Sequence, residues 1–154
     1  MPTFTPGHLG KWESLYNDLM DGEGSALTQE GTWMLGDKPG LVCVFEEDEP
    51  LFIEASSNIS KTLQCYIKGG SDCEFRTMLG IVEMGASVKN AAQRAKSGPL
   101  ALRISKRVEK FRYRVAPASA KTMQQLADAF NVVADTRYAG PSALANRALD
   151  ALPG

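Results

Sequence analysis

Residues 40–59 constrain the fold of this chain more than any other part of its sequence. Two short apolar runs, residues 41–45 and 51–53, flank four consecutive acidic residues and a proline. Apolar, β-branched and aromatic runs on either side of a polar turn are typical of a β-hairpin. Residues 56–58 read Ser-Ser-Asn, and such side chains often accept the first backbone hydrogen bonds of a helix. The sequence therefore predicts two paired strands that lead directly into a helix.

Apolar residues at helical spacing predict helices before and after the hairpin. The helix after it would carry Ile59, Leu63, Tyr66 and Ile67 on one face. The other predicted helices are residues 12–20, 74–84, 100–109, 121–134 and 144–152, while residues 1–10 are expected to be a loose arm and residues 26–35 remain ambiguous.

Strict alternation of apolar and basic residues over positions 110–116 predicts a third strand. Together with the helices, this predicts a fold of the α/β class, an α+β sandwich. Its small, three-stranded, mainly antiparallel sheet would be flanked by helices. We expect a single domain that comprises an N-terminal arm and helix (1–37), a core (38–140) and a C-terminal helix (141–154).

Composition argues against several kinds of partner. The formal net charge is −1 and the isoelectric point about 5.9, so the chain as a whole does not attract nucleic acid or an anionic membrane. No apolar run approaches the roughly 20 residues that a membrane span needs. The N-terminus lacks the pattern of a secretory signal. We therefore expect no membrane partner and a cytoplasmic location, with a virion as the alternative.

The metal-binding and redox-active residue types are few. Cys43, Cys65 and Cys73 lack the spacing of a zinc motif, and His8 is the only histidine. Because a zinc site needs several such ligands together, we expect none. Reduced thiols in a reducing compartment are the simplest interpretation of the three cysteines.

The predicted hairpin and helix start resemble the core of the GIY-YIG nuclease family. The two strand triplets read Gly-Leu-Val at 40–42 and Phe-Ile-Glu at 52–54, and the helix start reads Ser-Ser-Asn-Ile at 56–59. A weaker similarity follows in Phe75-Arg76 and Leu79-Gly80. The resemblance spans roughly residues 38–140. It implies the family's fold and, in active members, metal-dependent cleavage of a phosphodiester.

The resemblance also implies where reactive groups would lie. Active members use two strand tyrosines, a glycine after the second, a helix arginine and a metal-binding glutamate on a later helix. The matching positions in this chain are Val42, Phe52, Glu54, Thr62 and Ala127. Since none of these side chains can supply the corresponding chemistry, we expect no catalytic residues at these positions, no metal and no cofactor.

The interpretation that follows is a catalytically inactive GIY-YIG-like domain, kept as a structural or protein-binding module. Its partners would be other proteins or further copies of itself, and a phage or mobile-element assembly is one setting for it. The first alternative is a divergent, magnesium-dependent endonuclease that uses Lys61, Glu54 and Asp128 in a new geometry.

The second alternative is a nucleic-acid-binding module that does not cleave. Basic residues cluster near the third predicted strand, and Lys61 could extend their surface. The candidate contact residues are Lys61, Arg103, Lys106, Arg107, Lys110, Arg112 and Arg114. Clustered cations can hold a phosphate backbone, but acidic turns of this chain, such as residues 46–49, are equally suitable partners for them.

Overall fold

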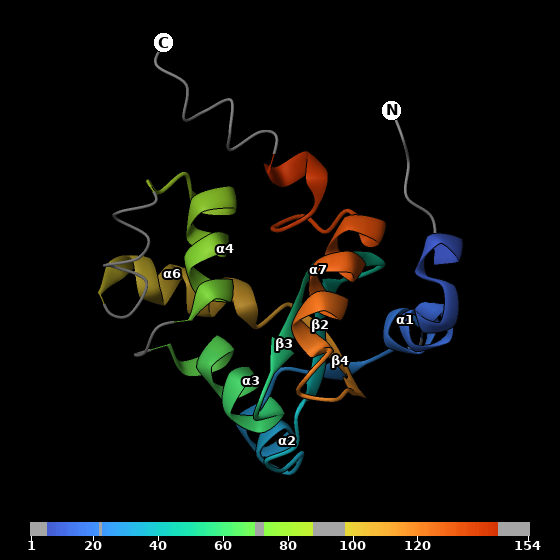
Figure 1. Ribbon diagram of the computed structural model, residues 1–154. Helices are drawn as coiled ribbons and strands as arrows, with labels where there is room; N and C mark the ends of the chain where they lie inside the picture. The colour runs from blue at the N-terminus through green and yellow to red at the C-terminus, as the bar shows by residue number, and fades with distance from the viewer. Residues whose placement is uncertain (1–5, 22, 70–72, 88–97, 145–154) are drawn as a thin grey trace.

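The predicted hairpin is present in the computed structural model, which describes residues 6–21, 23–69, 73–87 and 98–144 (Figure 1). β2 (Gly40–Glu46) and β3 (Glu49–Ser56) are antiparallel and joined by a two-residue turn. Both strands extend further into the acidic run than predicted, so that Glu46 pairs with Glu49. Pro50 lies within β3, where a register shift and the edge position of the strand tolerate its missing N–H.

The sheet has four strands in the order β1-β4-β2-β3, and every neighbouring pair is antiparallel. β4 (Arg112–Pro117) is the predicted third strand and pairs with β2. The expected count of three was too low because β1 (Ser25–Ala26) pairs with β4. A strand of two residues has no periodicity that a sequence pattern could detect.

Helices cover both faces of the sheet, which gives the predicted α+β arrangement (Figure 1). Alternation along β2 assigns the faces, because Val42 and Val44 join one buried cluster whereas Leu41 and Cys43 join another. The first face packs against α3 (Ile59–Lys68), α4 (Glu74–Met84) and α6 (Pro99–Val108). The second face packs against α1 (Glu13–Met20) and α7 (Met123–Ala134).

The start of α3 follows the predicted capping. The side chain of Asn58 accepts a hydrogen bond of 3.0 Å from the backbone N–H of Lys61, which satisfies one of the unpaired donors of the first turn. At the other end of the next helix, Gly85 adopts the left-handed conformation that ends α4, as expected.

Three segments differ from the prediction or lie partly outside the described residues. Residues 6–12 form a 3₁₀ helix, η1 (Pro6–Trp12), rather than a loose arm. The ambiguous segment contains α2 (Gln29–Trp33). Of the predicted C-terminal helix only residue 144 is described, and it belongs to a helical stretch whose described part is 141–144. In the described ranges, no helix is both long enough and apolar enough to cross a membrane.

Candidate functional site

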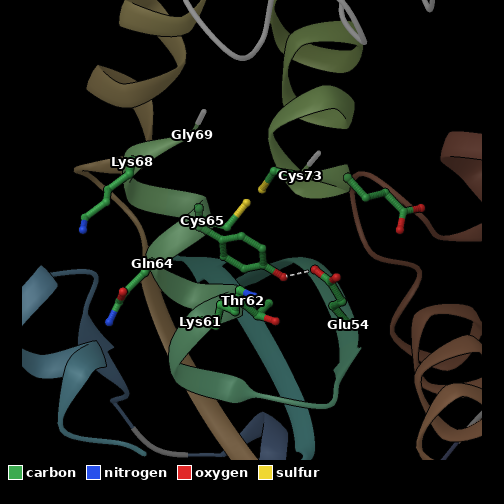
Figure 2. Close-up of a pocket in the computed structure, with 10 residues that line it drawn as sticks. Glu54, Lys61, Thr62, Gln64, Cys65, Lys68, Gly69 and Cys73 are labelled. Carbon is green, nitrogen blue, oxygen red and sulfur yellow. Dashed lines mark hydrogen bonds between the residues drawn. The ribbon is translucent and has the colours of Figure 1, made fainter. Parts of the chain in front are cut away.

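A cavity of about 350 Å³ lies between β3, α3 and the start of α4 (Figure 2). It brings together three residues that the sequence singled out, namely Glu54, Lys61 and Thr62. Its other lining residues are Gln64, Cys65, Tyr66, Lys68, Gly69, Cys73 and Glu74. The hairpin and the helix that follows it thus form most of the walls of this cavity.

Glu54 is one of two acids that line this cavity, and it has a buried partner. It lies opposite Val42 in the strand pairing, on the sheet face that α3 covers. The hydroxyl of Tyr66 donates a hydrogen bond to the Glu54 carboxylate (dashed in Figure 2). Burial raises the pKa of Glu54 from 4.5 to about 7, and the hydrogen bond from Tyr66 offsets this only in part. A large fraction of Glu54 is therefore protonated near neutral pH.

Val42 and Phe52 are part of the hydrophobic core beside Glu54. Their exposed fractions are 0% and 5%. The ring of Phe52 stacks on Phe75 with the centroids 6.2 Å apart, and Phe75 contacts the ring of Tyr66 at 4.4 Å. The two positions do lie on paired strands and in one cluster, as the resemblance implies. Their side chains offer packing and no proton.

Thr62 has a structural role at the junction of β3 and α3. Its hydroxyl is 2.6 Å from that of Ser56, which in turn accepts a hydrogen bond of 3.0 Å from the backbone N–H of Asn58. These bonds fix the angle at which the chain leaves the sheet and begins the helix. The position implied for a reactive arginine is thus occupied by a side chain that holds the backbone.

Ala127 does not join the cavity. It is buried on the opposite sheet face, in the cluster that contains Leu41 and Cys43. The neighbouring Asp128 instead lines a second groove of about 560 Å³ along the edge of β3, between α4 and α7. Glu54 and Glu74 border both depressions, whereas Lys61 borders only the first. The three residues of the nuclease alternative are therefore divided between two adjoining hollows.

The edge of β3 in this groove is already paired in part. The side chain of Asn131 accepts a hydrogen bond of 3.1 Å from the N–H of Ile53 and donates one of 2.8 Å to its carbonyl. The backbone N–H of Tyr138 donates to the carbonyl of Leu51 at 2.9 Å. These contacts take the place of a neighbouring strand and block the addition of another chain there.

Arg76 is the residue of this region that the sequence reasoning missed. Its exposed fraction is 1%, although it is charged. The guanidinium donates hydrogen bonds of 2.9 Å to the carbonyls of Tyr66 and Ala101 and to the hydroxyl of Ser105. The Tyr66 carbonyl lies in the last turn of α3, where unpaired carbonyls and the helix dipole favour a cation.

Two further features show how closely Arg76 is enclosed. Burial lowers the pKa of its guanidinium, and the Nε atom has no hydrogen-bond partner among the described residues. A side chain at Gly69 would approach that Nε to 2.9 Å, so glycine is required where α3 ends. The available signal was the place of Arg76 directly after Phe75 and three residues before Leu79, inside an apolar helical face.

Three of the six basic residues of this segment make contacts within this chain. Arg107 binds Glu46 through two hydrogen bonds of 2.5 and 2.7 Å and binds Glu83 at 2.6 Å. Arg112 donates to two backbone carbonyls, those of Glu23 and Gly24, at 2.9 Å. Arg114 lies 3.8 Å from the ring centre of Phe45. The remaining predicted contact residues of the segment, Arg103, Lys106 and Lys110, are exposed.

The acidic turn is the partner that the sequence had offered as an alternative to nucleic acid. Glu46 binds Arg107, and Glu49 binds Arg137. Phe111 and Tyr113, which alternate with the arginines, are buried. The segment thus contributes to the core and to internal ion pairs, and its outward charge is smaller than its sequence suggests.

The last two observations on the site concern metal ligands and similarity to known proteins. In the ranges that the structure covers, no group of three or more histidine, cysteine or acidic side chains is arranged to hold a metal ion. Comparisons of this chain with protein-family models, with curated proteins and with solved structures find no match.

Proposed function

We propose that this chain is a GIY-YIG-like scaffold that does not cleave nucleic acid and serves as a structural or protein-binding module. The observation that carries this proposal is the burial of Val42 and Phe52. Both occupy positions at which the resembling family has reactive tyrosines, and both pack into the core against helix α3 or α4. Side chains without hydroxyls at these positions stabilise the fold by burying apolar area and cannot transfer a proton.

The state of Glu54 supports the same proposal. Glu54 replaces the glycine that the family pattern has at this position, and it fills space beside the hairpin with a carboxyl group whose raised pKa leaves it partly protonated at neutral pH. A protonated carboxyl is a poor ligand for a hard divalent cation, which prefers charged oxygen. Its hydrogen bond with Tyr66 connects β3 to α3 and acts as part of the scaffold.

A surface suited to a protein partner lies next to the cavity. Trp33 and Met34, in and just after α2, have exposed fractions of 72% and 85%. Together with Gln64 and Lys68 of α3 they border a depression of about 470 Å³. Exposed aromatic and methionine side chains are enriched where proteins bind one another. A partner segment with an apolar anchor and an acidic group would complement Trp33 and Lys68, as in the assembly of a phage or mobile element.

One observation favours the nuclease alternative. Glu54 borders the cavity that contains Lys61 and also the groove that contains Asp128, so a substrate that spans both hollows would contact all three residues. In that case Lys61 would offset charge on phosphorus, and magnesium would need the ionised form of Glu54. This alternative requires the pKa of Glu54 to fall when the cation binds.

A nicking assay decides between the non-cleaving scaffold and the nuclease alternative. Purified protein is incubated with supercoiled plasmid and with single-stranded DNA, in magnesium and in manganese, at pH 7 and pH 8.5. We expect no nicking above that of a buffer control. Nicking that is lost in both Lys61→Ala and Glu54→Gln, and kept in Lys106→Ala at an exposed lysine elsewhere, would contradict the proposal.

The non-cleaving DNA-binding alternative needs a separate measurement. Fluorescence anisotropy of labelled single- and double-stranded oligonucleotides is followed at low salt and at physiological salt. Because Arg107, Arg112 and Arg114 are engaged within the chain, we expect no saturable binding at physiological salt. Saturable, salt-dependent binding that is abolished when Arg103, Lys106 and Lys110 are replaced together by alanine would support a nucleic-acid-binding module instead.

A further inference from the structure

Two of the three cysteines meet at the rim of the cavity. Cys65 lies in the last turns of α3, and Cys73 immediately precedes α4. Figure 2 shows their sulfur atoms turned toward one another, and both residues line the cavity. Cys43 is separate from them, since it lies in the cluster on the opposite sheet face with its sulfur 3.9 Å from that of Met20.

We propose that Cys65 and Cys73 form a redox-active dithiol, which a low-molecular-weight disulfide such as oxidised glutathione converts to an intramolecular disulfide. The geometry that supports this is the placement of the two thiols, which face one another at the rim of one cavity where α3 ends and α4 begins. A disulfide requires two β-carbons at close range with their sulfurs directed at each other, and facing thiols approach that arrangement. The seven residues between them in sequence give no such indication.

The two thiols differ in access, which sets the order of the reaction. Cys65 is half-buried and lines the cavity, whereas Cys73 is buried. The thiolate of Cys65 attacks one sulfur of oxidised glutathione, forms a mixed disulfide and releases one glutathione thiolate. The thiolate of Cys73 then attacks the Cys65 sulfur and releases the second. Two protein thiols are oxidised, two glutathione molecules are formed, and they take up the two protons.

The second step explains why the pair would close rather than retain glutathione. The Cys73 thiol faces the sulfur that it must attack and belongs to the same chain, so the step is intramolecular and has a high effective concentration. The neighbouring Cys65 thiol and then burial raise the pKa of the Cys73 thiol, so closure should become faster as the pH rises. The new bond would tie the end of α3, where Arg76 binds the Tyr66 carbonyl, to the start of α4.

The direct test uses the natural chain and needs no substitution. The folded protein is incubated with oxidised glutathione, blocked with iodoacetamide, digested with trypsin without reduction and analysed by mass spectrometry. Lys68 lies between the two cysteines, so cleavage separates peptide 62–68 from peptide 69–76. We expect these two peptides to be joined by a disulfide, and the intact protein to lose two hydrogen atoms and to melt several degrees higher.

Variants provide the matched controls. Cys43→Ala should form the same linked peptides, because Cys43 lies on the other sheet face. Cys65→Ser and Cys73→Ser should each lose the link and the rise in melting temperature. Three results would overturn the proposal: persistent glutathione on Cys65 without closure, a disulfide that includes Cys43, or no reaction of the folded chain. If either serine variant fails to fold, the peptide map of the natural chain still decides.

Discussion

The two ends of the hairpin treat charge in opposite ways. At the turn, Glu46 and Glu83 face Arg107, and Glu83 also accepts a hydrogen bond from the hydroxyl of Tyr138. At the cavity, Glu54 binds a tyrosine hydroxyl, and Arg76 binds carbonyl and hydroxyl oxygens. The first region joins opposite charges near the surface. The second region keeps an acid and a cation apart and solvates each with neutral groups.

The electrostatic consequences are opposite as well. The hydrogen bond from Arg107 lowers the pKa of Glu46, whereas burial raises the pKa of Glu54 to about 7. Nuclease chemistry needs charged groups that face a substrate. The groups at the turn are charged, but they face one another. In the cavity region, where the family resemblance places the chemistry, Glu54 is partly protonated and Arg76 is enclosed, while Lys61, Lys68 and Glu74 are exposed at the rim. This contrast is the physical basis for proposing a scaffold without catalysis.

Removing the enclosed cation should have the largest effect. Arg76→Ala leaves the carbonyls of Tyr66 and Ala101 without their donor and creates a cavity between α3, α4 and α6. We expect a loss of about 3–5 kcal/mol in the free energy of unfolding, or failure to fold. Urea denaturation measures it, with the exposed Arg103→Ala as a control that should change by less than about 0.5 kcal/mol. Equal effects of the two variants would mean that Arg76 is solvated.

The second test concerns the protonation of Glu54. Its pKa is higher in the folded than in the unfolded chain, so the folded state binds more protons between about pH 4.5 and pH 7. The free energy of unfolding should therefore fall as the pH rises through this window, by roughly 3 kcal/mol. Glu54→Gln keeps an acceptor for Tyr66 and should abolish this contribution.

The comparison that isolates Glu54 is made at two pH values. The Glu54→Gln variant should match the natural chain at pH 4 and exceed it in stability at pH 8.5, as followed by urea denaturation. Glu109→Gln, at an exposed acid, should retain the original pH dependence. A variant that is less stable than the natural chain at pH 8.5 would show that ionised Glu54 stabilises the fold.

The smallest effect is expected at the turn. Arg107→Ala should lower the free energy of unfolding by about 1 kcal/mol at neutral pH and low salt, because its pairs with Glu46 and Glu83 are partly exposed. The loss should shrink in high salt. It should also shrink as the pH falls through the lowered pKa of Glu46, which is the reverse of the Glu54 dependence.

Lys106→Ala is the neighbouring control for that experiment, since its side chain is exposed. It should leave stability within about 0.5 kcal/mol of the natural value at every salt concentration. A part of the Arg107 effect should persist in high salt, because the guanidinium lies 4.7 Å from the ring centre of Phe111 and covers it. An effect independent of salt and pH would indicate packing alone.

Local patterns in the sequence predicted much of the fold. The hairpin, the Asn58 cap, α4 and the alternation along β4 depend on residues close together in the chain, so period and turn chemistry sufficed. β1 was missed because its two residues become a strand only when β4 lies beside them. Pro50 was assigned to the turn for the same reason, because its place in β3 depends on the pairing of β3 with β2.

The candidate site was predicted only in part, because its contacts join distant positions. The positions of Val42, Phe52, Glu54 and Thr62 followed from the hairpin, but the partner of Glu54 did not. The pairing of Arg107 with Glu46 spans 61 residues, and periodicity carries no information about it. A basic residue in an amphipathic helix is usually exposed, so the burial of Arg76 depends on α3 and α6 packing around it.

The most direct test of the account is the ionisation of Glu54 itself, observed by ¹³C NMR of its carboxyl carbon in the natural chain. Glu54→Gln identifies the signal by removing it. We expect a titration midpoint near pH 7 that is unchanged when magnesium is added, because the carboxyl is enclosed with Tyr66 in the scaffold. A midpoint at or below 4.5 that shifts further with magnesium would show a charged, cation-binding carboxylate and contradict the account.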